Sequence, residues 1–295
     1  METKAKPPRP PPKPKSLSST ALKVPGQATT PVVGGKRGLG WPWNQPGSHF
    51  SLYQEYIDSG KISWVFNWEL WVPDSTPTGV EWIPCVRTAG NVKDVDPFLT
   101  DIIRRRGIKT SALLGFNEPE IPQQANLSVE QAVDLWKQVV LPAKAKFDLR
   151  LGSPGMSSDL GRSKPWLDSF LSQLAGHDGI DFLVLHWYGP LFSNMRNFLE
   201  LMHASYPSWP IWLNEFACST MNTGQCASEQ QVQDFLRDAL PWLDATPWIE
   251  RYAYFGNHDV GDWVGRASNF TEPGPVVDGS STTRLMNVAR LYCEL

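Results

Sequence analysis

Residues 110–118 read Thr-Ser-Ala-Leu-Leu-Gly-Phe-Asn-Glu, and residues 210–217 read Pro-Ile-Trp-Leu-Asn-Glu-Phe-Ala. Each stretch is a short apolar run that ends in an Asn-Glu pair, Asn117-Glu118 in the first and Asn214-Glu215 in the second. A carboxylate at the end of a buried strand must be neutralised or used in chemistry. The two stretches therefore predict two similar strands that carry polar groups to their ends.

Strand-like and helix-like segments alternate from residue 37 to the C-terminus, a pattern typical of a parallel sheet with crossover helices. The predicted strands are residues 39–44, 64–69, 81–86, 110–118, 150–156, 181–188, 210–218 and 251–258. Eight strands close a parallel barrel, which needs about 250 residues. We therefore predict an α/β fold, a single (β/α)₈ TIM barrel over residues 37–295. A doubly wound open sheet is the main alternative, but residues 39–46 lack its glycine-rich phosphate loop.

The predicted helices support the same architecture. They cover residues 50–59, 96–107, 165–174, 194–205 and 282–293, and two more begin at residues 128 and 228. The last two start with capping boxes, Ser128-Val-Glu-Gln131 and Ser228-Glu-Gln-Gln231. Residues 71–80 are rich in Pro, Thr and Gly, so the connection after the second strand should be irregular and poor in helix.

The composition narrows the classes of partner. The chain has 295 residues and a net charge of −3, and none of its apolar runs approaches the ~20 residues of a membrane-spanning helix. We expect neither a membrane nor a nucleic acid as partner, and we expect a monomer. Several of the 14 tryptophans stand beside Asn, Pro or Gly at strand ends, where flat rings suit sugar faces. Filling the core is the alternative role for any one of them.

The N-terminus and the cysteines bear on location. Residues 1–36 begin with a basic, proline-rich stretch without the apolar segment of a signal peptide, and we predict a disordered tail or linker there. Glycosylation sequons at Asn126 and Asn269 favour an extracellular or cell-wall protein, and an intracellular location stays open. Cys218 and Cys226 flank a short loop that a disulfide could close, and reduced thiols are the equal alternative.

Function in such a barrel is expected at the carboxyl ends of the strands. Glu118 and Glu215 end the fourth and seventh predicted strands, so they should face each other across the mouth of the barrel. A pair of carboxylates on either side of a cup is what hydrolysis of a glycosidic bond requires. Two structural glutamates held in ion pairs are the alternative.

Three motifs carry a family resemblance. Gly-Phe-Asn-Glu-Pro at 115–119, His-Trp-Tyr at 186–188 and Trp-Leu-Asn-Glu-Phe-Ala at 212–217 resemble the clan A glycoside hydrolases, in particular glycoside hydrolase family 128. The resemblance implies a β-1,3-glucan substrate, no metal or organic cofactor, Glu118 as general acid/base, Glu215 as nucleophile, and retention of anomeric configuration. The two carboxyl groups of a retaining pair should lie ~5 to 5.5 Å apart.

Other residues are expected to serve this chemistry. Asn117 should bond the sugar 2-hydroxyl, and His186 and Tyr188, which share a face of their strand, should orient Glu215. The remaining candidate substrate-binding residues are Trp43, Asn44, Asn67, Trp68, Phe255 and Trp263. We expect Trp187 to pack against the helix layer, and Glu69 and Glu120 to be solvated surface carboxylates.

One departure from the clan pattern concerns the eighth strand. It ends in Tyr252-Ala-Tyr-Phe-Gly-Asn-His without the tryptophan that many clan A enzymes place there, which leaves Phe255 or Trp263 to serve. The motifs report mechanism and not linkage, so a clan A hydrolase of another β-linkage remains an alternative. A non-hydrolytic β-glucan-binding protein on the same barrel is another. Whether cleavage is internal or from chain ends stays open.

Overall fold

The computed structural model describes residues 35–174, 179–221, 224–277 and 280–295. The chain divides into two units, Met1–Val32 and Val33–Leu295, and the described residues all belong to the second. The predicted tail, residues 1–36, lies outside the described residues except for its last two.

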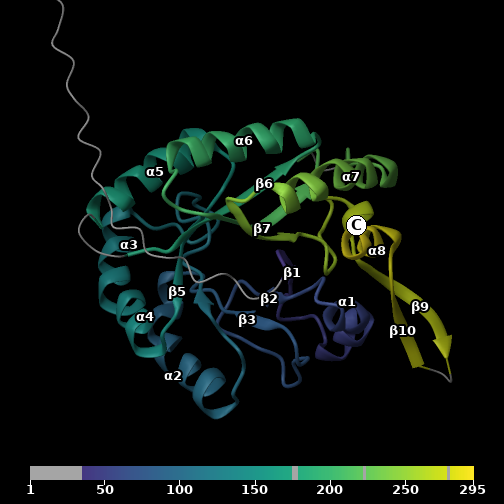
Figure 1. The fold of residues 1–295 in the computed structure, drawn as a ribbon, viewed down its shortest axis with the longest axis horizontal. Helices are drawn as coiled ribbons and strands as arrows, with labels where there is room; N and C mark the ends of the chain where they lie inside the picture. Colours follow the sequence, from purple (N-terminus) through teal and green to yellow (C-terminus); the bar gives the residue numbers. More distant parts are fainter. Residues whose placement is uncertain (1–34, 175–178, 222–223, 278–279) are drawn as a thin grey trace, which may run out of the picture. The chain divides into compact units, whose positions relative to one another are not determined.

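Eight parallel strands form one sheet in the order β3-β2-β1-β8-β7-β6-β5-β4 (Figure 1). They are β1 (Arg37–Gly40), β2 (Trp64–Phe66), β3 (Glu81–Ile83), β4 (Ala112–Leu113), β5 (Arg150–Met156), β6 (Phe182–Gly189), β7 (Ile211–Cys218) and β8 (Ile249–Tyr254). The sheet closes where Cys85, beyond β3, bridges Leu114, beyond β4. Two hydrogen bonds hold this seam, from Val86 N–H to Leu114 O (3.0 Å) and from Leu114 N–H to Pro84 O (2.9 Å). The predicted (β/α)₈ barrel is confirmed.

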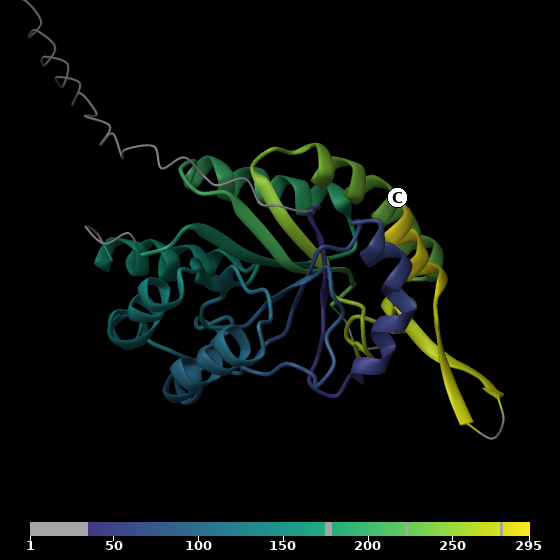
Figure 2. The ribbon, with the colours of Figure 1, turned by 60° about the horizontal axis from the view of Figure 1, so that its bottom comes forward.

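Helices surround the sheet on its outer side (Figure 2). They are η1 (Gly47–Tyr53), α1 (Gln54–Asp58), η2 (Ala89–Asp94), α2 (Val95–Leu99), η3 (Thr100–Arg105), α3 (Val129–Leu135), η4 (Trp136–Val140), α4 (Leu141–Phe147), α5 (Leu160–Gln173), α6 (Phe192–Ser205), α7 (Glu229–Ala245), η5 (Arg266–Ser268) and α8 (Asn287–Glu294). Both predicted capping boxes are present, at Ser128 and Ser228. The connection between β2 and β3 contains no helix, as predicted.

The structure corrects the predicted helix over residues 282–293. Residues Ser280–Leu285 form β10, which pairs antiparallel with β9 (Thr271–Val277), and helix begins only at Asn287. The hairpin leaves the ring of helices beside α8 (Figure 1). Pro273 and Pro275 hide β9 in the sequence because proline is rare in strand interiors, and the partner strand then looks like the start of a helix.

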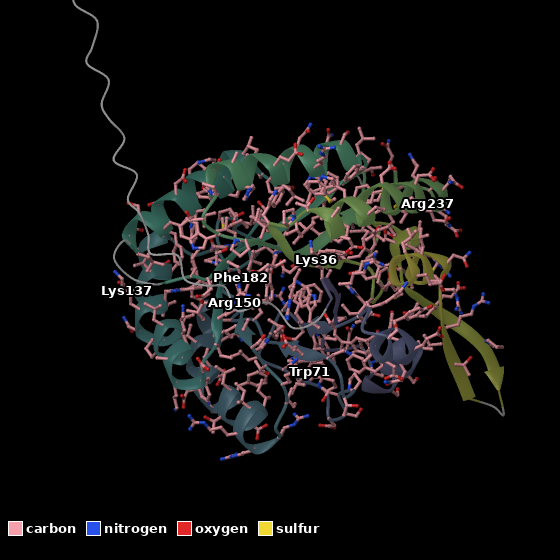
Figure 3. All side chains as sticks on the ribbon, viewed as in Figure 1. Lys36, Trp71, Lys137, Arg150, Phe182 and Arg237 are labelled. Atoms are coloured by element: carbon pink, nitrogen blue, oxygen red, sulfur yellow. The ribbon has the colours of Figure 1, made fainter. Side chains whose placement is uncertain are left out.

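Large aromatic side chains fill the inside of the barrel. Phe182 and Trp212 stack with ring centroids 3.9 Å apart, and the Trp64 ring lies 5.4 Å from that of Trp212. Figure 3 shows Arg150 and Phe182 near the centre of the ring, with Lys137 and Arg237 at its edge. At Gly38 a Cβ atom would lie only 2.3 Å from the Trp64 ring, so this glycine makes room for the indole.

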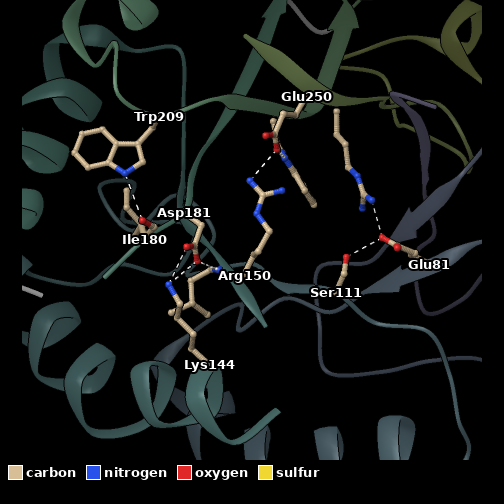
Figure 4. Close-up of polar contacts among 11 residues, drawn as sticks. Glu81, Ser111, Lys144, Arg150, Ile180, Asp181, Trp209 and Glu250 are labelled. Atoms are coloured by element: carbon tan, nitrogen blue, oxygen red, sulfur yellow. Dashed lines mark hydrogen bonds and ion pairs between the residues drawn. The ribbon is translucent and has the colours of Figure 1, made fainter. Parts of the chain in front are cut away.

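Charged side chains occupy the amino-terminal end of the barrel (Figure 4). The buried Arg251 pairs with Glu81 at 2.6 Å and lies 4.5 Å from the centroid of the Trp212 ring. Arg150 pairs with Glu250 at 2.9 Å nearby. Because this end is filled by charge pairs and aromatic rings, the carboxyl ends of the strands are left to form a site.

Candidate active site

A hollow of about 600 Å³ opens at the carboxyl ends of the strands, a volume typical of small-ligand sites. Nine of the predicted site residues line it: Trp43, Asn67, Trp68, Asn117, Glu118, Tyr188, Glu215, Phe255 and Trp263. His186 lies beneath it as a buried side chain, and Asn44 lines a neighbouring hollow instead. The structure therefore brings the two predicted glutamates into one cavity.

Glu215 is held on β7 by two uncharged donors. The Tyr188 hydroxyl donates to Glu215 Oε2 at 2.7 Å, and the Trp68 indole N–H donates to Oε1. Burial and the adjacent Glu215 raise the pKa of Tyr188 well above its ordinary value, so the phenol keeps its proton and remains a donor. Trp68 was predicted as a substrate-binding residue, and its hydrogen bond to Glu215 was not foreseen. These two donors fix both oxygens of the Glu215 carboxyl group.

Glu118 has an unusual backbone conformation. Its φ of 44° lies in the left-handed region, which costs a residue with a side chain on the order of 1 kcal/mol. The Glu118 N–H donates to Gly155 O at 2.8 Å, and the Glu118 carbonyl accepts from Ile121 N–H at 3.0 Å. The preceding Asn117 N–H donates to Arg87 O at 3.0 Å. Neighbouring segments thus hold a strained turn that places Glu118 at the mouth of the barrel.

His186 connects the two glutamates. Its Nδ1 lies 2.8 Å from Glu118 Oε1, and its Nε2 lies 3.4 Å from Glu215 Oε1 without hydrogen-bond geometry. Burial alone would lower the pKa of His186, but the carboxylates of Glu215 and Glu118 outweigh burial and raise it to about 9. The imidazole is therefore a cation between two carboxyl groups at neutral pH. We expected it to orient Glu215, and its stronger contact is with Glu118.

Two further carboxylates differ in their surroundings. Glu120 is half-buried: its Oε1 accepts from Ser157 N–H at 2.9 Å, and its Oε2 has no partner among the described residues. Burial raises the pKa of Glu120. The expectation of a solvated surface carboxylate is therefore wrong for Glu120, because the turn after Glu118 folds it inward. Glu69 pairs with Arg87 at 3.2 Å, and both line the hollow.

The side-chain amides of Asn67 and Asn117 already have hydrogen-bond partners. Asn67 Nδ2 donates to Trp71 O at 2.6 Å, and its Oδ1 accepts from Glu69 N–H at 3.0 Å, so this side chain shapes its loop. Asn117 Nδ2 donates to Gln124 Oε1 at 3.2 Å at the wall of the hollow.

An aromatic wall faces Glu215. Phe255, just beyond β8, lies 5.6 Å from both the Trp68 and Trp263 rings. Burial lowers the pKa of the adjoining His258 to about 4, so this ring is neutral at physiological pH. Phe255, directly after β8, and Trp263 thus both line the hollow. Trp187 is buried and stacks on Phe235 of α7 at 5.7 Å, as expected.

Three further features of the described ranges are the cysteines, possible metal ligands and the length of the helices. All four cysteines are free thiols there, so the Cys218–Cys226 disulfide is absent, and Cys226 is exposed. No cluster of three or more His, Cys, Asp or Glu side chains in the described part could hold a metal ion. No described helix has the length and apolar character needed to cross a membrane.

Comparison with known proteins decides the family. The glycosyl hydrolase catalytic core family matches residues 38–284. The chain belongs to this family. Alkali-sensitive linkage protein 1 of Schizosaccharomyces pombe is 29% identical over 225 residues, which are 76% of this chain and 39% of that protein. The chain thus spans well under half the length of this curated relative.

Solved structures of glycoside hydrolase family 128 have the same fold. The subgroup III enzyme of Blastomyces gilchristii, a curdlan-specific exo-β-1,3-glucanase in complex with glucose, is 28% identical. It matches with a TM-score of 0.67 over 88% of this chain and 98% of that chain. The subgroup I endo-β-1,3-glucanase of Amycolatopsis mediterranei, in complex with laminaritriose, is 25% identical with a TM-score of 0.67. That match covers 88% of this chain and 99% of that chain. The resemblance to family 128 is confirmed, and with it the class, a glycoside hydrolase.

Proposed function

We propose that this glycosyl hydrolase catalytic core cleaves β-1,3-glucosidic bonds of β-glucan with retention of configuration. Glu118 acts as general acid/base and Glu215 as nucleophile. The observation that carries the proposal is the unequal setting of the two glutamates in one hollow. Glu215 receives two neutral donors, Tyr188 and Trp68, whereas Glu118 contacts the His186 imidazole.

In the first step, one Glu215 oxygen attacks the anomeric carbon while Glu118 gives its proton to the departing glycosidic oxygen. A glucosyl-enzyme ester forms, and the leaving sugar departs as an alcohol. The hydrogen bonds from Tyr188 and Trp68 fix the attacking carboxylate before the reaction, so little reorganisation accompanies it.

In the second step, Glu118 takes a proton from water, which attacks the same carbon and releases Glu215 as a carboxylate. The His186 imidazolium donates from Nδ1 to Glu118 Oε1, which leaves the other carboxyl oxygen of Glu118 to carry the proton that is transferred. His186 therefore serves as a positioning group, whose positive charge offsets the growing charge on Glu118 when the leaving sugar takes its proton.

The linkage is proposed from the relatives. Both enzymes described above are β-1,3-glucanases, one exo-acting and one endo-acting. The aromatic wall around Phe255 and Trp263 suits the flat faces of glucose rings. Because the two relatives differ in cleavage pattern, the comparison supports the bond type and leaves the choice between exo and endo cleavage to product analysis.

Glu118→Gln and Glu215→Gln test the assigned roles. Each change keeps the side-chain shape and removes an ionisable group, so kcat on a linear β-1,3-glucan should fall by about 10³-fold or more. Initial rates of reducing-end release measure the loss, and circular dichroism checks the fold. Glu200→Gln, at a solvent-exposed ion pair on α6, is the matched control and should keep full activity.

The two roles separate with an activated aryl β-glucoside. Its leaving group needs little acid assistance, so Glu118→Gln should retain much of the first step while Glu215→Gln remains inactive. Normal activity of Glu215→Gln on either substrate would remove the nucleophile assignment.

A further inference from the structure

A second hollow of about 360 Å³ lies beside the first, and we call it the outer hollow. Two loops form it, residues 43–47 beyond β1 and residues 71–75 beyond β2. Trp43 lines both hollows and is 66% exposed, so its indole stands on the ridge between them. A glucan chain that leaves the catalytic hollow on this side would pass over the Trp43 ring.

Gln45 is the feature that points to a ligand. The residue is only 9% exposed and lines the outer hollow, and its Nε2 finds no acceptor among the described residues. A buried amide without a partner loses its hydrogen bonds to water and gains none in return. Its backbone carbonyl accepts from Trp41 Nε1 at 3.1 Å, which fixes the residue's position while leaving the side-chain amide unengaged.

The remaining lining matches a neutral polyhydroxylated ligand. The outer hollow has two indole rings, Trp43 and Trp71, and three polar side chains, Asn44, Asp74 and Ser75. Its described lining contains no Lys or Arg, so an anionic ligand would find no charge partner. The Trp71 carbonyl accepts from the Asn67 amide at 2.6 Å and from the Trp82 indole N–H at 3.1 Å, and these two bonds hold this side of the hollow in place.

The two loops also approach closely. A Cβ atom at Gly47 would lie 2.9 Å from Ser75 Oγ and 3.3 Å from Pro73 Cβ, so the wall between the loops depends on glycine. The two loops therefore pack closely against each other, and this packing defines the shape of the outer hollow.

We propose that the outer hollow is a distal subsite that binds a further glucosyl unit of the same glucan chain, with Gln45 hydrogen-bonded to a sugar hydroxyl and Trp43 against a ring face. This inference rests on the proposed function, because it takes the ligand to be a glucan that extends from the catalytic hollow. It adds that long chains bind more tightly than short ones through residues that touch neither Glu118 nor Glu215.

Gln45→Ala, compared with the unaltered chain on linear β-1,3-gluco-oligosaccharides of graded length, tests the subsite. The ratio of kcat/KM between the longest and shortest substrates should fall by about three- to tenfold, the worth of one hydrogen bond. Gln54→Ala, on helix α1 away from both hollows, is the matched control and should leave this ratio unchanged.

Because Gln45 is buried, replacing it could disturb the fold, so a second variant at exposed residues tests the subsite independently. Asn44→Ala combined with Asp74→Ala removes two exposed groups of the same hollow and should lower the same ratio. Titration of long and short oligosaccharides into Glu215→Gln, with and without Gln45→Ala, measures binding in the absence of turnover. Adding Gln45→Ala should lower the affinity for long chains only.

The outcomes separate the two proposals. If oligosaccharides are cleaved and neither variant changes the length dependence, the subsite is wrong and the proposed activity stands. If nothing is cleaved but affinity for long chains falls with Gln45→Ala, the subsite stands and the proposed activity is wrong. If oligosaccharides of every length neither bind nor react, both are overturned.

Discussion

One buried imidazole links the two groups that would carry the reaction. His186 is 1% exposed and contacts Glu118 and Glu215 through its two ring nitrogens. A histidine placed between two carboxylates gains more from their charge than it loses by burial, which is why its pKa rises to about 9. The same contact makes the charge state of the site, and not only its shape, depend on a single side chain.

The stability of the protein should therefore vary with pH through His186. Its folded pKa of about 9 exceeds the ordinary 6.5, so its stabilising contribution is complete below pH 6.5 and is lost as the pH rises through 9. Urea unfolding between pH 6 and 10 should show the unfolding free energy falling by about 1 to 3 kcal/mol more in the unaltered chain than in His186→Gln. Parallel curves for the two proteins would show that His186 is not charged at neutral pH.

Sequence patterns predicted the residues that strand geometry alone determines. Glu118, Glu215, His186 and Tyr188 follow from apolar runs that end in polar residues and from the alternation of side chains along a strand. The Trp68 donor, the Glu69–Arg87 pair and the inward turn of Glu120 depend on how separate loops approach each other. No local pattern encodes that approach.

At the scale of elements, β5 gives His186 its space. Gly155 on β5 lies against the imidazole, and a Cβ atom there would be 2.7 Å from His186 Nε2 and 3.1 Å from Cε1. The Gly155 carbonyl also accepts the Glu118 N–H that holds the strained turn. One glycine thus sets the position of both partners of the Glu118–His186 contact.

Gly155→Ala should lower activity without unfolding the barrel. Moving the imidazole by a few tenths of an ångström would disturb its contacts with both glutamates, and kcat should fall by about tenfold or more while KM changes less. The pH profile should shift as well, which a purely structural defect would not produce. Gly90→Ala, where the nearest atom to the new Cβ is 3.5 Å away, is the control and should retain activity.

The sequence predicted the type of most strands and helices more accurately than their end residues. Five predicted strands ran three to five residues past their observed ends, for example 39–44 against Arg37–Gly40 in β1, whereas the predictions for β5, β6 and β7 end within one residue of the observed ends. Several residues beyond these strands, such as Trp41 and Phe116, are aromatic and fully buried, and so they look like strand in the sequence. The hairpin of β9 and β10 was missed because its prolines and turn residues resemble a loop.

At the scale of the whole barrel, a buried ion pair fastens the end opposite the site. Glu81 on β3 contacts Arg251 on β8 at 2.6 Å and Lys109 at 2.9 Å, and Ser111 donates to the same carboxylate at 2.8 Å. Burial would raise the pKa of Glu81, but Arg251 and Lys109 outweigh it and lower the pKa below 4.5.

Glu81→Gln should destabilise the fold and leave the site intact. Removing the carboxylate leaves the buried charge of Arg251 without its partner. The unfolding free energy at pH 7 should therefore fall by about 3 kcal/mol. Because the pKa of Glu81 is lowered in the folded state, its contribution is present above pH 4.5 and is lost as the pH falls, so the difference should shrink in acid. Glu272→Gln removes the contact of a partly exposed carboxylate with the exposed Arg284 and should cost less than about 1 kcal/mol. An equal effect of the two changes would show that the barrel does not depend on this pair.

The most direct test of the central claim is the configuration of the sugar released at the earliest times from a linear β-1,3-gluco-oligosaccharide, followed by proton NMR. Retention through a Glu215 ester predicts that the new reducing end appears first as the β-anomer and then mutarotates. First appearance of the α-anomer would contradict the assignment of Glu215 as nucleophile, and an oligosaccharide that stays intact would contradict the proposed activity.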